Sequence, residues 1–243
     1  MIKRQASLIP SFHAAAFSYS SRPMNFIVTA GPTIEKLDMV RRLTNFSTGR
    51  TGTEMANFLA GRGHHVTFLI GEQATWNGQR RAQRIIPFST TADLQEKLKG
   101  LSKNPMNAVL HCAAVGDFMF SKVWKRDAEG KLQEVSSEKF STRDGALLAE
   151  LVPTPKLIGQ LHDWFPKSQV VGWKYEVEGK REDALAAAQM LMEESKISAC
   201  VANGPAYGDG FGLVAPSGQR HFAGTAGLFS ALEDFVARKS AKS

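Results

Sequence analysis

Several features that would narrow the function are missing from this sequence of 243 residues. It has only two cysteines, Cys112 and Cys200, so a disulfide framework is excluded and free thiols in a reducing compartment are expected. No stretch approaches the roughly 18 uninterrupted apolar residues that a membrane span requires. The six histidines are dispersed, without the spacing of metal ligands. We therefore expect neither a protein-held metal nor a membrane-spanning segment.

Acidic residues are missing from residues 1–23, a basic segment rich in serine and alanine. This composition is typical of an organelle presequence, but also of a start placed too early, because Met24 directly precedes the first strong strand pattern. We expect residues 1–23 to be a disordered N-terminal extension and residues 24–243 to form a single domain. The basic residues elsewhere are scattered, which suits an anionic small substrate and gives no stripe for binding nucleic acid.

Apolar runs alternate with helical patterns after residue 24. This alternation predicts βαβ units, and hence an α/β fold with a modified Rossmann-like, mostly parallel sheet and helices on both faces. The expected strands are Phe26–Ala30, His65–Ile70, Arg84–Phe88, Ala108–Ala113, Ser168–Lys174 and Ala199–Asn203. The expected helices are Gly52–Gly61, Ala92–Leu101, Pro155–Trp164, Arg181–Glu194 and Gly224–Lys239.

Two segments break the alternation. Residues Phe118 to Leu147 contain a turn signal at Ala128-Glu-Gly130, which predicts a flap or hairpin standing off the sheet. Flaps of this kind cover sites or join subunits. Residues Gly204 to Gly218 have the pattern of a β-hairpin with its turn at Pro216-Ser-Gly.

The most informative stretch follows the first expected strand and reads Asn45-Phe-Ser-Thr-Gly-Arg-Thr-Gly52. It is neither a Walker A sequence nor a Gly-x-Gly-x-x-Gly dinucleotide fingerprint. Its glycines let backbone N–H groups approach oxygens, Ser47 and Thr48 add hydroxyls, Arg50 adds charge, and a helix start adds its dipole. The stretch predicts a phosphate-binding loop. The alternative is a glycine-rich helix N-cap that binds no ligand.

Two further polar clusters follow strands, Ala113-Ala-Val-Gly-Asp117 and Asn203-Gly-Pro. Ligands of parallel sheets bind beyond the carboxyl ends of the strands, so we expect these clusters and the loop to share one edge. Together the segments resemble the phosphopantothenoylcysteine synthetase (phosphopantothenate–cysteine ligase) family, in its stand-alone, eukaryotic-like form. The matching pieces, in the family's order, are Thr29-Ala-Gly with Thr33, Val40 to Gly52, Ala113 to Asp117, Glu138-Lys139, Leu151-Val-Pro-Thr-Pro155, Val171-Gly-Trp-Lys-Tyr-Glu176 and Val201-Ala-Asn203.

The resemblance implies a cytoplasmic ligase that joins 4'-phosphopantothenate and L-cysteine in coenzyme A biosynthesis. A nucleoside triphosphate activates the carboxylate as an acyl-nucleotide and releases pyrophosphate, and the cysteine amine then displaces the nucleoside monophosphate. The resemblance also implies Mg²⁺ carried by the triphosphate, ATP or CTP, and a homodimer whose flap, Phe118 to Gln133, crosses to the partner. Both reactants are anionic, so catalysis would depend on positioning and charge stabilisation.

The resemblance assigns roles to single residues. Asn45 corresponds to the asparagine that contacts the acyl intermediate, and Lys139 to the lysine that closes onto the nucleotide phosphates. Simpler roles are a turn residue for Asn45, a solvated lysine for Lys139, an N-cap for Asp117 and a core aromatic for Trp173. The implied nucleotide- and phosphate-binding residues are Gly31, Ser47, Thr48, Gly49, Arg50, Gly52, Ala113, Asp117, Pro155, Ile158, Trp173 and Lys174.

Departures from the family pattern leave other functions open. Pro32 stands where a second glycine is usual, which removes one backbone donor. Lysine clusters of the bacterial form are missing after Lys139 and in the helix before Val201, so ATP and CTP both stay open. One alternative is an NAD(P)-dependent Rossmann oxidoreductase, although its fingerprint glycines are missing. The other is a non-catalytic nucleotide-binding relative, which Pro32 and the missing lysines favour.

Overall fold

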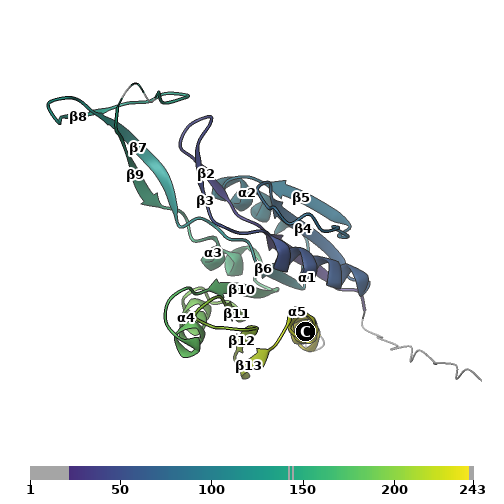
Figure 1. Ribbon diagram of the computed structural model, residues 1–243. Coiled ribbons are helices and arrows are strands. Elements are labelled where there is room, and N and C mark those ends of the chain that lie inside the picture. The colour runs from purple at the N-terminus through teal and green to yellow at the C-terminus, as the bar shows by residue number, and fades with distance from the viewer. Residues whose placement is uncertain (1–21, 142, 144, 241–243) are drawn as a thin grey trace, which may run out of the picture.

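The computed structural model describes residues 22–240 except 142 and 144, so the expected extension at residues 1–23 lies almost wholly outside the described residues. Over that described part, eight strands form one sheet in the order β13-β12-β11-β10-β6-β1-β4-β5 (Figure 1). Their bounds are β1 (Asn25–Ala30), β4 (His65–Gly71), β5 (Arg84–Phe88), β6 (Ala108–His111), β10 (Gln169–Tyr175), β11 (Ala199–Asn203), β12 (Phe211–Ala215) and β13 (Gly218–Phe222).

Strand β1 lies in the middle of the parallel part of the sheet. Every pairing from β5 through β4, β1, β6 and β10 to β11 is parallel, and only β12 and β13 pair antiparallel. Going outward from β1, the chain adds β4 and β5 on one side and then β6, β10 and β11 on the other, which is the order of doubly wound nucleotide-binding sheets. The direction of winding reverses between β1 and β6, so a ligand crevice is expected beyond their carboxyl ends.

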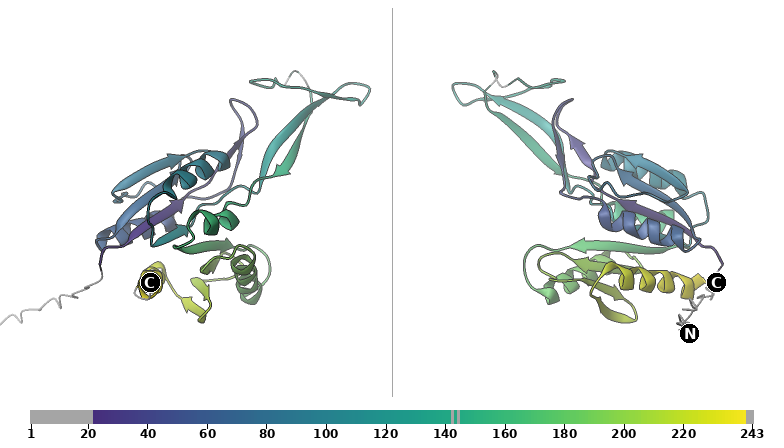
Figure 2. Two further views of the ribbon diagram at one scale, coloured as in Figure 1. Left: turned by 180° about the vertical axis from the view of Figure 1, so that it is seen from behind. Right: turned by 45° about the vertical axis from the view of Figure 1, so that its right-hand side comes forward.

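Helices cover both faces of the sheet because the parallel strands are apolar on both sides (Figure 2). Leu59 of α1 and Leu228 of α5 pack against Phe26 and Phe68 on one face. Leu94 of α2 packs on the other face, with residues of α3 and α4. Each such buried side chain contributes about 1.5–3 kcal/mol. The helices are α1 (Arg50–Gly61), α2 (Thr91–Leu101), α3 (Leu157–Trp164), α4 (Arg181–Glu194) and α5 (Thr225–Ser240).

The α/β fold with a mostly parallel sheet is therefore confirmed. The expected strands and helices match the observed ones to within two residues at each end, and the expected C-terminal hairpin is β12–β13. None of the helices within the described ranges is long and apolar enough to cross a lipid bilayer.

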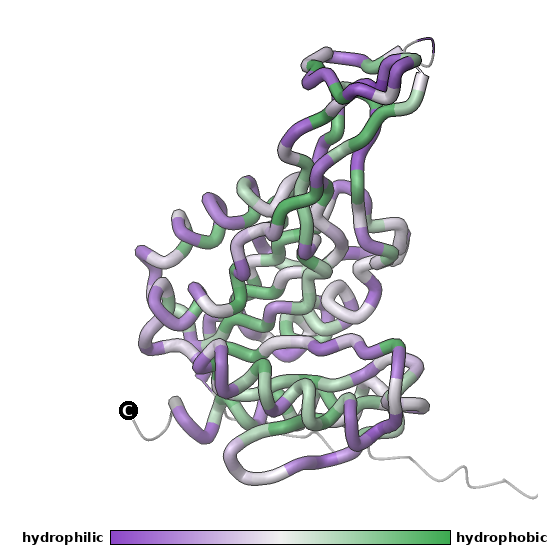
Figure 3. The backbone as a smooth tube through the Cα atoms, turned by 90° about the vertical axis from the view of Figure 1, so that its left-hand side faces the viewer, coloured by the Kyte–Doolittle hydropathy of each residue, from purple (hydrophilic) through white to green (hydrophobic). Residues whose placement is uncertain are grey.

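A second, three-stranded antiparallel sheet stands off the main one as a flap (Figure 1). It consists of β7 (Phe118–Arg126), β8 (Leu132–Glu134) and β9 (Leu147–Pro153), so it extends beyond the expected end at Leu147. Figure 3 shows hydrophobic and hydrophilic stretches alternating along the flap. This alternation is what a thin sheet with little core behind it requires.

The sequence did not indicate a short hairpin directly after β1. Its strands, β2 (Ile34–Lys36) and β3 (Arg42–Thr44), pair antiparallel, and β2 lies against β7 of the flap. The hairpin rises beside the flap in both views of Figure 2. It leads from β1 into the loop that precedes α1.

Candidate active site

The connections that follow β1 and β6 run side by side beyond the end of the sheet. Ala114 donates its N–H to Gly31 O at 2.9 Å, and Thr33 donates its N–H to Ala114 O at 3.2 Å. The hydroxyl of Thr33 also accepts the N–H of Gly116 at 2.8 Å. The loop that carries Asp117 is thus fixed against the β1 connection, at the point where the winding reverses.

Glycines let the start of α1 approach this point closely. Gly49 is the N-cap of α1 with a φ of 77°, a left-handed conformation that favours glycine. A Cβ at Gly49 would lie 3.0 Å from Ala74 Cβ, and one at Gly31 would lie 2.9 Å from the same atom. A Cβ at Gly52 would lie only 2.5 Å from Ala30 Cβ. Gly31, Gly49 and Gly52 are therefore required by packing, and the structure brings all three together.

The first turn of α1 offers donors to an anion. The first N–H groups of a helix have no partner inside it, and the first turn of α1, described in full, contains no acid. Thr48 accepts the N–H of Arg50 on its hydroxyl at 3.2 Å, while the Arg50 guanidinium pairs with Glu54 at 2.7 Å and stays largely exposed. Ser47 lies one residue before Thr48 in a tight turn. Backbone donors, hydroxyls and the helix dipole together fit a phosphate group.

Asn45 contacts the loop that follows β6. Its Nδ2 lies 3.2 Å from Val115 O and 3.5 Å from Ala114 O, both in the loop after β6. The side chain is exposed. Asn45 therefore joins the segment before α1 to the loop that carries Asp117, and the structure places it between the elements that the sequence grouped with it.

The loop after β6 also meets the start of α3. Asp117 accepts the N–H of Thr154 on its backbone oxygen at 2.9 Å, and its carboxylate pairs with Lys156. Lys156 is the N-cap of α3 and lies between Pro155 and Ile158. The sequence did not single out Lys156, since a lysine before a short helix carries no distinctive signal.

Trp173 and Lys174, near the end of β10, point to opposite faces of the sheet. Trp173 packs on the face of α1 and α5, with its indole Nε1 buried and without a hydrogen-bond partner. Ala113 and Ile158 pack on the other face. Lys174 pairs with Glu176 at 2.8 Å. The four residues thus surround the strand ends, but Trp173 does not share a face with Ile158.

Lys139 lies in the loop between β8 and β9, apart from the start of α1. Its neighbour Glu138 accepts the N–H of Met39 at 2.9 Å, which places Lys139 at the tip of the β2–β3 hairpin. The hairpin returns to its base over the five residue steps from Met39 to Thr44, roughly 16 Å at about 3.3 Å each. Within one chain the structure does not bring Lys139 to the phosphate loop.

A buried histidine at the end of β6 escaped the sequence analysis. His111 Nδ1 lies 2.9 Å from the hydroxyl of Thr29, which also accepts the N–H of Ala113 at 3.1 Å. Burial lowers the pKa of His111 to about 4. Only its position before Ala113 could have drawn attention to it.

The two thiols are poor nucleophiles at neutral pH. Burial raises the pKa of Cys112 well above its ordinary value and that of Cys200 to about 12, so both thiols stay protonated. Across residues 22–240, apart from 142 and 144, no three His, Cys, Asp or Glu side chains gather closely enough to hold a metal. Mg²⁺ brought by a triphosphate needs no such protein cage.

Comparison with known proteins identifies the domain. Residues 22–217 match the family described as the DNA/pantothenate metabolism flavoprotein C-terminal domain. The chain belongs to this family. Its members include the phosphopantothenoylcysteine synthetase domain, so the resemblance seen in the sequence is confirmed.

Individual relatives agree with this membership. The coenzyme A biosynthesis bifunctional protein CoaBC of Thermococcus kodakarensis is 29% identical over 73% of this chain and 40% of its own length. The chain spans less than half of the length of such curated relatives. Among solved structures, the DNA/pantothenate metabolism flavoprotein from Streptococcus pneumoniae has a TM-score of 0.75 at 20% identity, covering 88% of this chain and 98% of that one. A Cab2 variant in complex with phosphopantothenate-cysteine has a TM-score of 0.69 at 16% identity, covering 90% and 88%.

Proposed function

We propose that this chain is a phosphopantothenate–cysteine ligase that uses a nucleoside triphosphate and forms an acyl-nucleotide intermediate. The observation that carries the proposal is the meeting of the start of α1, Asn45 and the Asp117 loop beyond the ends of β1 and β6. Membership of the synthetase family supports it. The Cab2 variant, which was solved with phosphopantothenate-cysteine, shares the fold.

In the first half-reaction, the carboxylate of phosphopantothenate attacks the α-phosphate of ATP or CTP and pyrophosphate leaves. The backbone N–H groups at the start of α1 and the hydroxyls of Ser47 and Thr48 would hold phosphate oxygens, and Arg50 would add positive charge. Mg²⁺ bound to the triphosphate would neutralise part of its charge. Asp117 and the residues around Ile158 would hold the nucleoside at the strand ends.

In the second half-reaction, the amine of cysteine attacks the acyl carbon, and the nucleoside monophosphate leaves with the electrons of the broken acyl–phosphate bond. Negative charge develops on the acyl oxygen in between. Asn45 is held beside the loop after β6 by Val115 and Ala114, so its amide would donate to this oxygen. A neutral amide does so without a charge of its own that would have to be paired.

The acting unit in this proposal is a homodimer joined through the flap and the β2–β3 hairpin. Large apolar side chains are exposed on both elements, for example Met39 at 77% on the hairpin and Phe118 at 47% on the flap. A set of such residues on adjoining elements is typical of an interface. A flap that crosses to the partner would also bring Lys139 to a phosphate loop that it does not reach in its own chain.

The test is the release of pyrophosphate: a first turnover should require only phosphopantothenate and the triphosphate, and continued release should require cysteine as well. Asn45→Asp should still form the acyl-nucleotide, detected by mass spectrometry of quenched mixtures, but should release little phosphopantothenoylcysteine, because the carboxylate cannot donate to the oxyanion. Asn104→Asp, at the other end of the sheet, is the matched control and should retain wild-type turnover.

Other outcomes would favour other functions. Nucleotide binding without any pyrophosphate release would make the chain a non-catalytic relative. Hydride transfer with NAD(P)H would make it an oxidoreductase. Normal product formation by Asn45→Asp would show that Asn45 is only a turn residue. Loss of the acyl-nucleotide would show that Asn45 acts in the activation step instead.

A further inference from the structure

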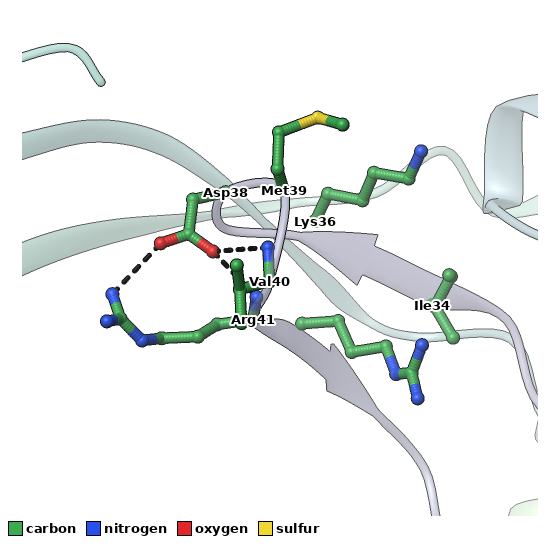
Figure 4. Close-up of a pocket in the computed structure, with 7 residues that line it drawn as sticks. Ile34, Lys36, Asp38, Met39, Val40 and Arg41 are labelled. Atoms are coloured by element: carbon green, nitrogen blue, oxygen red, sulfur yellow. Dashed lines mark hydrogen bonds and ion pairs between the residues drawn. The ribbon is translucent and has the colours of Figure 1, made fainter. Parts of the chain in front are cut away.

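The tip of the β2–β3 hairpin grips the segment that carries Lys139. Asp38 accepts the N–H groups of Val40 and Arg41 on Oδ1, at 2.8 and 2.6 Å, which closes the turn of the hairpin. Its Oδ2 accepts the guanidinium of Arg41 at 2.9 Å and the N–H of Phe140 at 3.3 Å. Figure 4 shows the carboxylate of Asp38 with its contacts to Val40 and Arg41.

The grip has three bonds, one before Lys139 and two after it. Met39 donates its N–H to Glu138 O at 2.9 Å, Asp38 accepts the N–H of Phe140, and Arg41 donates from Nη2 to Phe140 O at 2.9 Å. The carboxylate of Asp38 is fully buried, and Phe140 is 5% exposed. Lys139 itself is exposed. The backbone around Lys139 is therefore tied down on both sides while its side chain points to solvent.

The same hairpin leads at its other end into Asn45. Its base is fixed by the hydroxyl of Thr44, which donates to Thr33 O at 2.8 Å. One short element thus connects Asn45 to the grip on Lys139. A rigid connection of this kind sets where the lysine is presented, whichever active site it serves.

We propose that Asp38 is a positioning residue that holds the Lys139 segment on the hairpin tip, so that Lys139 is presented to the triphosphate on a fixed backbone. This inference rests on the proposed ligase function. Asp38 acts through Phe140 and Arg41 and touches no reacting atom.

Asp38→Asn separates the two roles of this carboxylate. The asparagine Oδ1 still accepts the two N–H groups that close the turn, but Nδ2 cannot accept from Phe140 or pair with Arg41. The grip is weakened while the hairpin keeps its turn. Asp127→Asn is the matched control, since Asp127 Oδ1 also accepts a backbone N–H, from Lys131 at 2.7 Å, at another turn of the flap.

The first readout needs no activity. Trypsin should cleave after Lys139 about tenfold faster in Asp38→Asn than in wild type or Asp127→Asn, the factor that loss of one charge-assisted hydrogen bond gives at its lower end. Equal cleavage rates in all three proteins would overturn the grip. This result is independent of whether the chain is a ligase.

The second readout is turnover. Asp38→Asn should lower kcat about tenfold without changing KM for cysteine, and it should add no further loss in a chain that already carries Lys139→Gln. An equal loss in the presence and absence of Lys139→Gln would show a general structural role and overturn the inference. A wild-type protein without pyrophosphate release would instead refute the proposed function, while the trypsin result would still stand.

Discussion

Replacement of Gly52 by alanine tests whether α1 must lie directly on β1. A Cβ at this position would lie 2.5 Å from Ala30 Cβ and 2.9 Å from Thr29 O, and neither atom belongs to a flexible side-chain end that can move aside. The start of α1 must therefore shift outward. Overpacking of this kind typically costs about 1–3 kcal/mol.

Gly61 provides a control in the same helix, because nothing lies within 4 Å of the Cβ that alanine would add there. Gly61→Ala should stabilise the protein by up to about 1 kcal/mol, since alanine loses less conformational entropy on folding. The two variants should thus differ by roughly 1–4 kcal/mol. At about 2–4 °C per kcal/mol for a domain of this size, the Tm of Gly52→Ala should be about 2–16 °C lower than that of Gly61→Ala.

The assay pairs thermal unfolding with calorimetric titration of ATP and of CTP. Gly52→Ala should lose at least about tenfold in nucleotide affinity, since the N–H groups at the start of α1 move away from the phosphates. Gly61→Ala should bind like wild type. Equal stability of the two variants would refute the packing argument. A destabilised Gly52→Ala with unchanged nucleotide affinity would refute the assignment of the phosphate loop.

Three further predictions concern other parts of the molecule. Lys139→Gln should lower turnover on the order of 10²-fold if the lysine stabilises charge on the phosphates. Wild-type turnover would show instead that Lys139 is an ordinary solvated lysine. His111 has its pKa lowered to about 4, below the unfolded value, so stability should be complete above about pH 6.5 and fall by up to about 3 kcal/mol toward pH 4. Denaturant unfolding as a function of pH should show this fall in wild type and a smaller one in His111→Gln. Leu151→Arg, on the flap, should dissociate the proposed dimer in sedimentation experiments, whereas Ile85→Arg, at a similarly exposed position on β5, should leave it intact.

The periodic elements could be predicted from sequence because each is long enough to show its pattern. Strands such as β1 and helices such as α4 bury regular sets of apolar residues, and glycines marked the start of α1. The closeness of the β1 and β6 connections could be inferred as well, since both begin where parallel strands end at one edge of the sheet.

The β2–β3 hairpin and the position of Lys139 could not be predicted, because they depend on contacts between residues far apart in the sequence. Each strand of the β2–β3 hairpin has only three residues, too few to show a strand period. Lys36 and Arg42 are cross-strand neighbours, so the hairpin also lacks the apolar pattern that would have indicated two strands. The position of Lys139 follows from bonds to Asp38 and Arg41, about a hundred residues earlier in the chain. Sequence pattern indicates that a loop exists but not which hairpin holds it.

The central place of β1 has a consequence for the order in which the protein is made. Asn25 pairs with His65 of β4, but Phe26 also pairs with Ala108 of β6, whose own other neighbour, β10, begins at Gln169. A growing chain that has emerged only as far as β5 therefore has β1 exposed along one whole edge, with apolar residues on both faces. Such an edge pairs readily with other chains. We expect the ribosome-bound chain to need a chaperone until β6 emerges, and the β1 and β6 connections to meet only then.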